Sequence, residues 1–133
     1  MAHAGEGMRA LRILLVDDNL DHVALATRAL RQEPTWKVES VRLGGEAMER
    51  AAEEAFDLVL LDYRLPDMSG LDVLRGLRAR PKPPAVLLMT SQGSEEVAME
   101  ALKLGASAYV VKNTEFGRRL VYEVREWVAA REA

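Results

Sequence analysis

The chain has 133 residues, which is enough for one domain with a buried core. It contains no cysteine, which excludes disulfides and thiolate metal sites and fits a reducing compartment. Its formal net charge of −3 argues against direct binding to nucleic acid, and no apolar stretch approaches the roughly 20 residues of a membrane helix. Residues 1–10 are expected to form a flexible tail without an export signal. We therefore expect one cytoplasmic domain over residues 11–133.

Five short runs of mostly apolar residues follow, and segments of helix length separate them. Four of the runs are almost continuously apolar, which is typical of parallel strands covered on both faces. The second run alternates with polar residues and therefore suits an edge strand. The runs are Arg12–Val16, Lys37–Val41, Leu58–Leu61, Ala85–Met89 and Ala108–Val111.

The segments between the strands have the apolar spacing of amphipathic helices. Ser94 is expected to cap the fourth helix, and Gly105 to close it. Alternation of strand and helix predicts a parallel sheet with right-handed crossovers and helices on both faces. The predicted helices cover Leu20–Arg31, Gly45–Glu54, Gly70–Arg80, residues 95–104 and Glu115–Arg131.

Polar side chains stand where four of these strands end, namely Asp17 with Asp18, Asp62, Thr90 and Lys112. Each of them alone is most simply a cap, a turn residue or a solvated charge. Ligands of doubly wound sheets bind at the carboxyl ends of the strands, however, and all five residues are expected there. The coincidence predicts one pocket with three acids, a hydroxyl and an ammonium.

Phosphoryl transfer requires such a set of groups. Three neighbouring carboxylates repel one another unless a cation intervenes, and Mg²⁺ is the hard divalent ion that oxygen ligands favour. Asp62 is then the nucleophile that forms an aspartyl-phosphate. Lys112 can pair with the phosphoryl oxygens, and Thr90 can donate a hydrogen bond if it moves inward. Pro66 and Gly70 suit the tight loop that follows Asp62.

Four segments carry a resemblance to a known family: Ile13–Asn19, Leu60–Gly70, Met89–Ser91 and Ala108–Lys112. With these motifs in this order, the chain resembles the receiver domain of two-component response regulators from about Leu11 to Arg131. The resemblance implies a flavodoxin-like α/β fold, in which a doubly wound five-stranded parallel sheet has strand order 2-1-3-4-5 and five helices. The family is not a class of enzymes, although a receiver can catalyse its own phosphorylation and dephosphorylation.

The resemblance also implies roles for individual residues. Asp62 would accept a phosphoryl group from a histidine kinase or a phosphotransfer protein. Asp18, Asp62 and the Arg64 carbonyl would ligate Mg²⁺, while Asp17 would act mainly through water. Thr90 and Tyr109 would form a coupled switch that changes the surface of residues 95–131. That surface would face an output domain or a partner protein, and the resemblance leaves a homodimer open.

Three positions depart from the family pattern or vary within it. The family usually follows its lysine with a proline in a cis peptide, whereas Asn113 follows Lys112 here. The sequence leaves open whether this peptide is cis or trans. Arg64 and Gln92 occupy the positions that tune the lifetime of the phosphoryl group.

Two other classes remain as alternatives. The chain could be a receiver-like interaction domain that is never phosphorylated, and a lack of Mg²⁺ binding would favour this class. Phosphatases of the haloacid dehalogenase type also use a strand-end aspartate with Mg²⁺. They place a second acid two residues later, where this chain has Arg64.

Overall fold

A computed structural model describes residues 10–91 and 95–132 of the protein. The expected tail therefore lies outside the described residues except for Ala10, as do Gln92 and the predicted cap Ser94. Among the described residues, no helix has both the length and the apolar character needed to cross a bilayer.

Five parallel strands form one sheet in the order β2-β1-β3-β4-β5, which confirms the predicted fold. The second strand, which alternates in sequence, lies at one edge as predicted. Its first residue is Trp36, whose ring is buried. The strands are β1 (Leu11–Val16), β2 (Trp36–Val41), β3 (Leu58–Asp62), β4 (Ala85–Thr90) and β5 (Ala108–Val111).

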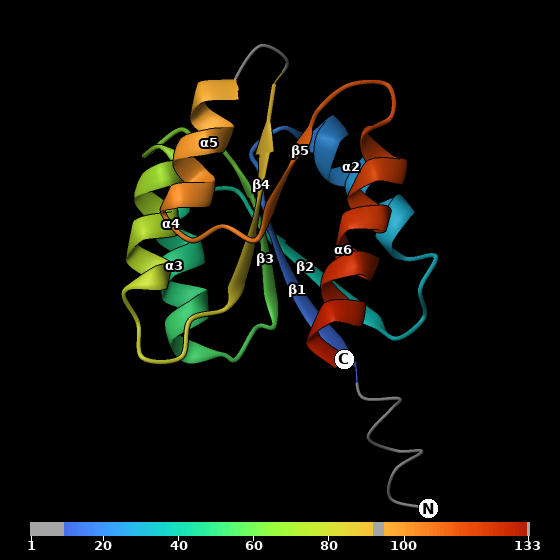
Figure 1. The fold of residues 1–133 in the computed structure, drawn as a ribbon, viewed down its shortest axis with the longest axis horizontal. Helices are drawn as coiled ribbons and strands as arrows, with labels where there is room; N and C mark the ends of the chain where they lie inside the picture. The colour runs from blue at the N-terminus through green and yellow to red at the C-terminus, as the bar shows by residue number, and fades with distance from the viewer. Residues whose placement is uncertain (1–9, 92–94, 133) are drawn as a thin grey trace, which may run out of the picture.

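Helices cover both faces of the sheet, with α2 and α6 on one face and α3, α4 and α5 on the other (Figure 1). The bounds lie within two residues of those predicted. The N-cap of α2 is Asn19, whose side chain accepts hydrogen bonds from the Asp21 and His22 amides. Gly105, with φ +108°, follows α5, as expected for a glycine that closes a helix. The helices are α2 (Leu20–Leu30), α3 (Gly44–Glu53), α4 (Gly70–Arg78), α5 (Glu95–Lys103) and α6 (Phe116–Glu132).

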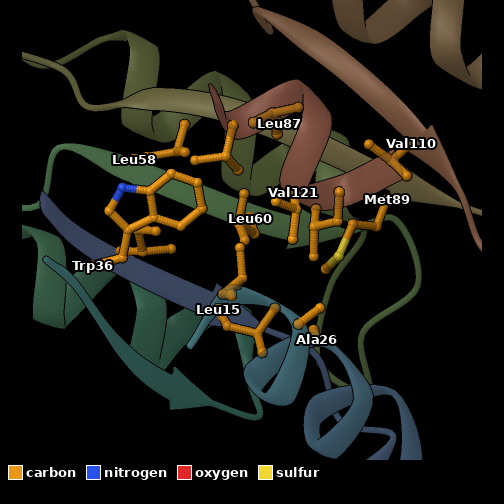
Figure 2. Packing of buried hydrophobic residues seen from close by; sticks show 14 of the residues in the cluster. Leu15, Ala26, Trp36, Leu58, Leu60, Leu87, Met89, Val110 and Val121 are labelled. Carbon is orange, nitrogen blue, oxygen red and sulfur yellow. The ribbon is translucent and has the colours of Figure 1, made fainter. Parts of the chain in front are cut away.

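Alternate residues of each strand contribute to two separate cores. On the α2–α6 face, Leu15, Leu60 and Met89 are fully buried and pack with Trp36 and residues of both helices (Figure 2). On the opposite face lie Val16, Leu61 and Leu88, which pack against α3, α4 and α5. Complete burial of one such side chain contributes roughly 1.5–3 kcal/mol, so the two cores fix the register of the central strands firmly.

Candidate functional site

The five predicted site residues lie at the carboxyl end of the sheet. Asp62 and Thr90 are the last residues of β3 and β4, and both are buried. Asp17 and Lys112 come directly after β1 and β5, where the strand pairing continues for one more step. The Asp17 amide donates to the Val41 carbonyl at 3.1 Å, and the Lys112 amide to the Thr90 carbonyl at 2.7 Å. Main-chain hydrogen bonds therefore hold the backbone of both residues in line with the sheet.

Strand alternation divides these residues between the two faces of the sheet. Asp17, Asp62 and Lys112 each follow a residue of the α2–α6 core by two positions, so their side chains start on that face. Thr90 follows Leu88 by two positions, and Leu88 belongs to the opposite core. The charged groups and the hydroxyl therefore share one edge of the sheet but approach it from opposite sides.

Asp17, Asp18 and Asp62 can place one carboxylate oxygen each within 4.8 Å of one another. This oxygen-only donor set fits a hard divalent cation. Both Asp17 oxygens already have partners, since Oδ1 accepts from the Asn19 amide at 3.0 Å and Oδ2 from Lys112 Nζ at 2.7 Å. Asp18 is half-buried and has no hydrogen-bond partner among the described residues. The three carboxylates therefore offer a metal ion one oxygen each.

The Asp62 carboxylate is poorly stabilised in its charged form. Burial raises its pKa to about 6, and the negative charge of Asp17 acts in the same direction. The Lys112 ammonium, 3.2 Å from Asp62 Oδ1, and a hydrogen bond from the Arg64 amide oppose this rise. Near neutral pH the group is mostly ionised, as a nucleophile must be, yet it lacks sufficient positive charge nearby.

The loop after Asp62 packs tightly against the end of β3. A Cβ on Gly70 would overlap the Asp62 carbonyl oxygen and lie 2.8 Å from Tyr63 Cα, so only glycine fits there. The Gly70 amide also donates to the Tyr63 carbonyl at 2.6 Å. The predicted role of Gly70 in a tight approach is therefore confirmed.

Asp67, in the same loop, ties it to the start of α3. Its two oxygens accept from the Gly44 amide at 2.8 Å and the Gly45 amide at 2.9 Å, and these bonds lower the pKa of Asp67. The N-cap residue of α3 is Leu43, which cannot cap with its side chain. Sequence reasoning missed this contact because the cap comes from more than 20 positions away and no local pattern marks it.

Thr90 and Tyr109 lie on neighbouring strands and on the same face of the sheet. Tyr109 pairs in register with Leu88, and Thr90 pairs with Val111. Thr90 is 1% exposed, whereas Tyr109 is 38% exposed and lines a surface groove with Leu102 and Arg119. The two side chains thus share one face of neighbouring strands, with Thr90 buried and Tyr109 partly open to solvent.

The Lys112–Asn113 peptide is trans, as are all peptide bonds of the described residues. Asn113 nevertheless orders the turn, because its amide donates to the Val111 carbonyl at 3.0 Å and its side chain accepts from the Glu115 amide at 2.9 Å. The Lys112 ammonium contacts both Asp17 and Asp62, although no proline follows the lysine. Arg64 is exposed on the loop beside Asp62.

His22 is a member of the site that sequence reasoning did not identify. It lies in the first turn of α2, and its Nδ1 is 3.0 Å from Lys112 Nζ and 3.9 Å from Asp17 Oδ2. The sequence could have indicated His22 only through its position, because the first turn of the helix that follows Asp17 and Asp18 borders the same edge of the sheet.

Comparison with known proteins gives one consistent family. The family model of the response regulator receiver domain matches residues 13–124. The chain is 38% identical over 104 residues to the transcriptional regulatory protein ZraR of Escherichia coli K12, covering 78% of this chain and 23% of that protein. It is also 38% identical over 122 residues to the response regulator protein PilR of Pseudomonas aeruginosa PAO1, covering 92% of this chain and 26% of that protein. The chain therefore spans about a quarter of the length of these relatives.

Solved structures agree with this match. A CheY-like response regulator receiver domain from Methanospirillum hungatei JF-1 is similar with a TM-score of 0.81 and 30% identity. The similarity covers 92% of this chain and 97% of that one, so most of the fold has a counterpart in a receiver domain.

Proposed function

Since the chain belongs to the receiver domain family of response regulators, we propose that Mg²⁺-dependent phosphorylation of Asp62 controls its interactions. The arrangement around Asp62 supports this proposal more than any other observation. Its buried carboxylate ends a central strand, with two further acids and one ammonium within reach. Mg²⁺ would be held by Asp18, Asp62 and the Arg64 carbonyl, with Asp17 acting mainly through water.

Each residue has a defined part in the transfer. An Asp62 oxygen attacks the phosphorus of the donor, the bond from phosphorus to the donor atom breaks, and that atom keeps the electron pair. The Lys112 ammonium pairs with an oxygen of the transferred group, and Thr90 donates a hydrogen bond to another. Bound Mg²⁺ would supply positive charge to the phosphoryl oxygens in the transition state.

Phosphorylation of Asp62 would change the structure on the other face of the sheet, which α5 covers. Thr90 starts on the face covered by α5, so its movement toward the phosphoryl group opens space for Tyr109 to turn inward. This change would alter the surface of residues 95–131, which would contact an output domain or a partner protein. The donor would be a histidine kinase or a phosphotransfer protein of the cytoplasm, with Arg64 and Gln92 setting the phosphoryl lifetime.

A direct test is incubation with acetyl phosphate and Mg²⁺, followed by intact-mass analysis. We expect the mass of one added phosphoryl group, no addition with EDTA, and none in Asp62→Asn. Asp72→Asn is the matched control, because this exposed acid of α4 pairs only with Arg75 among the described residues. Persistent labelling of Asp62→Asn would overturn the assignment of Asp62. Absence of labelling in the wild-type protein would favour an interaction domain that is not phosphorylated.

Metal binding is tested separately by titration calorimetry with Mg²⁺. Asp18→Asn removes a ligand and should weaken Mg²⁺ binding by roughly 100-fold. Glu54→Gln, which removes an acid far from the pocket, should leave the affinity unchanged. Equal affinities of wild type and Asp18→Asn would contradict the proposed ligand set.

A further inference from the structure

Lys112 is a long, flexible side chain whose charged end must be held in place to act on a phosphoryl group. Its backbone is fixed by the hydrogen bond to the Thr90 carbonyl, but a lysine still loses rotamer entropy when its end is ordered. The side chain is only 9% exposed, so water does little to position the ammonium. Neighbouring acceptors must therefore determine where it lies.

Three acceptors surround Lys112 Nζ: Asp17 Oδ2 at 2.7 Å, His22 Nδ1 at 3.0 Å and Asp62 Oδ1 at 3.2 Å. An ammonium has three hydrogens and no lone pair, so it can donate to Asp17 and His22 while it pairs with the charge of Asp62. His22 Nδ1 faces this donor-only group, so the contact assigns it the role of acceptor, with the ring proton on Nε2.

Two neighbours limit where the His22 ring can lie. Its backbone amide donates to the Asn19 side chain at 3.1 Å, which fixes the first turn of α2. The Phe116 ring, at the start of α6, lies 6.4 Å from the imidazole between centroids and tilted by 53°. The helix cap and the aromatic neighbour therefore restrict the positions that Nδ1 can take.

The three acceptors differ in charge, and this difference gives His22 a distinct role. Asp17 and Asp62 cancel part of the lysine's positive charge when they bind it. A neutral imidazole nitrogen fixes the ammonium without cancelling any of that charge. The lysine can then keep its full attraction for an anionic phosphoryl group while its position is maintained.

We propose that His22 is a positioning residue whose Nδ1 holds the Lys112 ammonium at the pocket, ready to meet the phosphoryl group on Asp62. This inference rests on the proposed function for the phosphoryl step, but the contact itself exists in the unmodified protein.

Two variants of His22 separate an acceptor role from a packing role. His22→Leu keeps the approximate size of the side chain but replaces the polar ring with an apolar group and so removes the acceptor. His22→Asn places its side-chain oxygen close to the position of Nδ1 and so keeps an acceptor. Neither change touches the helix cap, because Asn19 binds the backbone amide at position 22.

The first measurement is NMR of the lysine ammonium groups in protein labelled with ¹⁵N-lysine, without phosphodonor. A held ammonium exchanges its hydrogens slowly, so we expect a Lys112 signal in wild type and His22→Asn that is lost in His22→Leu. An unchanged signal in His22→Leu would overturn the proposal. This NMR result does not depend on phosphorylation. If the wild-type protein took up no phosphoryl group from acetyl phosphate, the proposed function would be refuted, and the contact between His22 and Lys112 would still be judged by NMR.

The second measurement is the rate of phosphorylation by acetyl phosphate with saturating Mg²⁺. Misplacement of the ammonium in His22→Leu should slow labelling roughly 10- to 100-fold, whereas His22→Asn should stay within about threefold of wild type. Equal losses in both variants, with a matching fall in urea midpoint, would assign His22 a packing role and overturn the inference.

Discussion

Two clusters of charged side chains near opposite ends of β1 differ in net charge and in burial. Near the amino end, Arg12 contacts Glu54 at 2.6 Å and Glu39 at 3.0 Å, and Arg50 pairs with the same two acids. Two guanidinium groups and two carboxylates balance, and each side chain is at least 29% exposed. At the carboxyl end, three carboxylates face one ammonium, which leaves a net charge of −2 around buried groups.

This difference separates a structural cluster from a functional one. A balanced cluster is complete, and both guanidinium groups also lie over the Phe56 ring, at 4.7 and 5.6 Å. An unbalanced and buried cluster costs stability until a cation binds. The net charge therefore predicts opposite signs for the same kind of substitution at the two ends, and the following experiments test this.

The largest expected effect is that of Lys112→Met, which removes the ammonium that pairs with Asp17 and Asp62. Asp17 is 1% exposed and would lose its charged partner, so the free energy of unfolding in EDTA should fall by about 3 kcal/mol. Urea denaturation measures this change. Mg²⁺ should restore part of the loss, because it neutralises the same carboxylates. A variant as stable as wild type in EDTA would show that the lysine does not balance the cluster.

Removal of an acid from the same cluster should have the opposite effect. The pKa of Asp62 is raised by burial from its ordinary value of 3.8 to about 6. Its contribution to stability is therefore full below pH 4 and is lost as the pH rises through about 6. In EDTA near pH 8, Asp62→Asn should be more stable than wild type by about 1–2 kcal/mol, because the ionised carboxylate is no longer buried.

The pH series provides the control for this prediction. Urea midpoints of wild type and Asp62→Asn should converge as the pH falls toward 4, where both side chains are neutral. Asp72→Asn should not show this pattern, because that exposed acid is already paired with Arg75. A difference between wild type and Asp62→Asn that is independent of pH would contradict the burial of an ionised Asp62.

The sequence predicted the sheet and its strand ends well, because these depend on local patterns. Continuous apolar runs identified the buried strands, and the change from apolar to polar residues at Asp62 and Thr90 marked the ends of two of them. Parallel topology then brought residues from four distant segments to one edge. The alternating second strand was correctly placed at an edge for the same reason.

Contacts between side chains of different elements could not be predicted from the sequence. Asp67 caps α3 from a distant loop without any local signal, and His22 holds Lys112 with no signal beyond its position in the first turn of α2. The division of the pocket between two faces also required the register, since a shift of one residue would move Thr90 to the other side. Distances between segments decide such contacts, and spacing along the chain does not.

The smallest expected effect lies at the balanced cluster, and its sign completes the comparison. Hydrogen bonds from Arg50 and Arg12 lower the pKa of Glu54, so its contribution to stability is present above its unfolded pKa and is lost as the pH falls through the folded value. Glu54→Gln should therefore destabilise slightly near pH 7, in contrast to Asp62→Asn. Arg50→Gln should also destabilise, because either change unbalances the cluster. Both losses should shrink at high salt in urea titrations, since these groups are exposed to solvent. Stabilisation by Glu54→Gln at neutral pH would show that removal of an acid acts in the same way at both ends of the sheet.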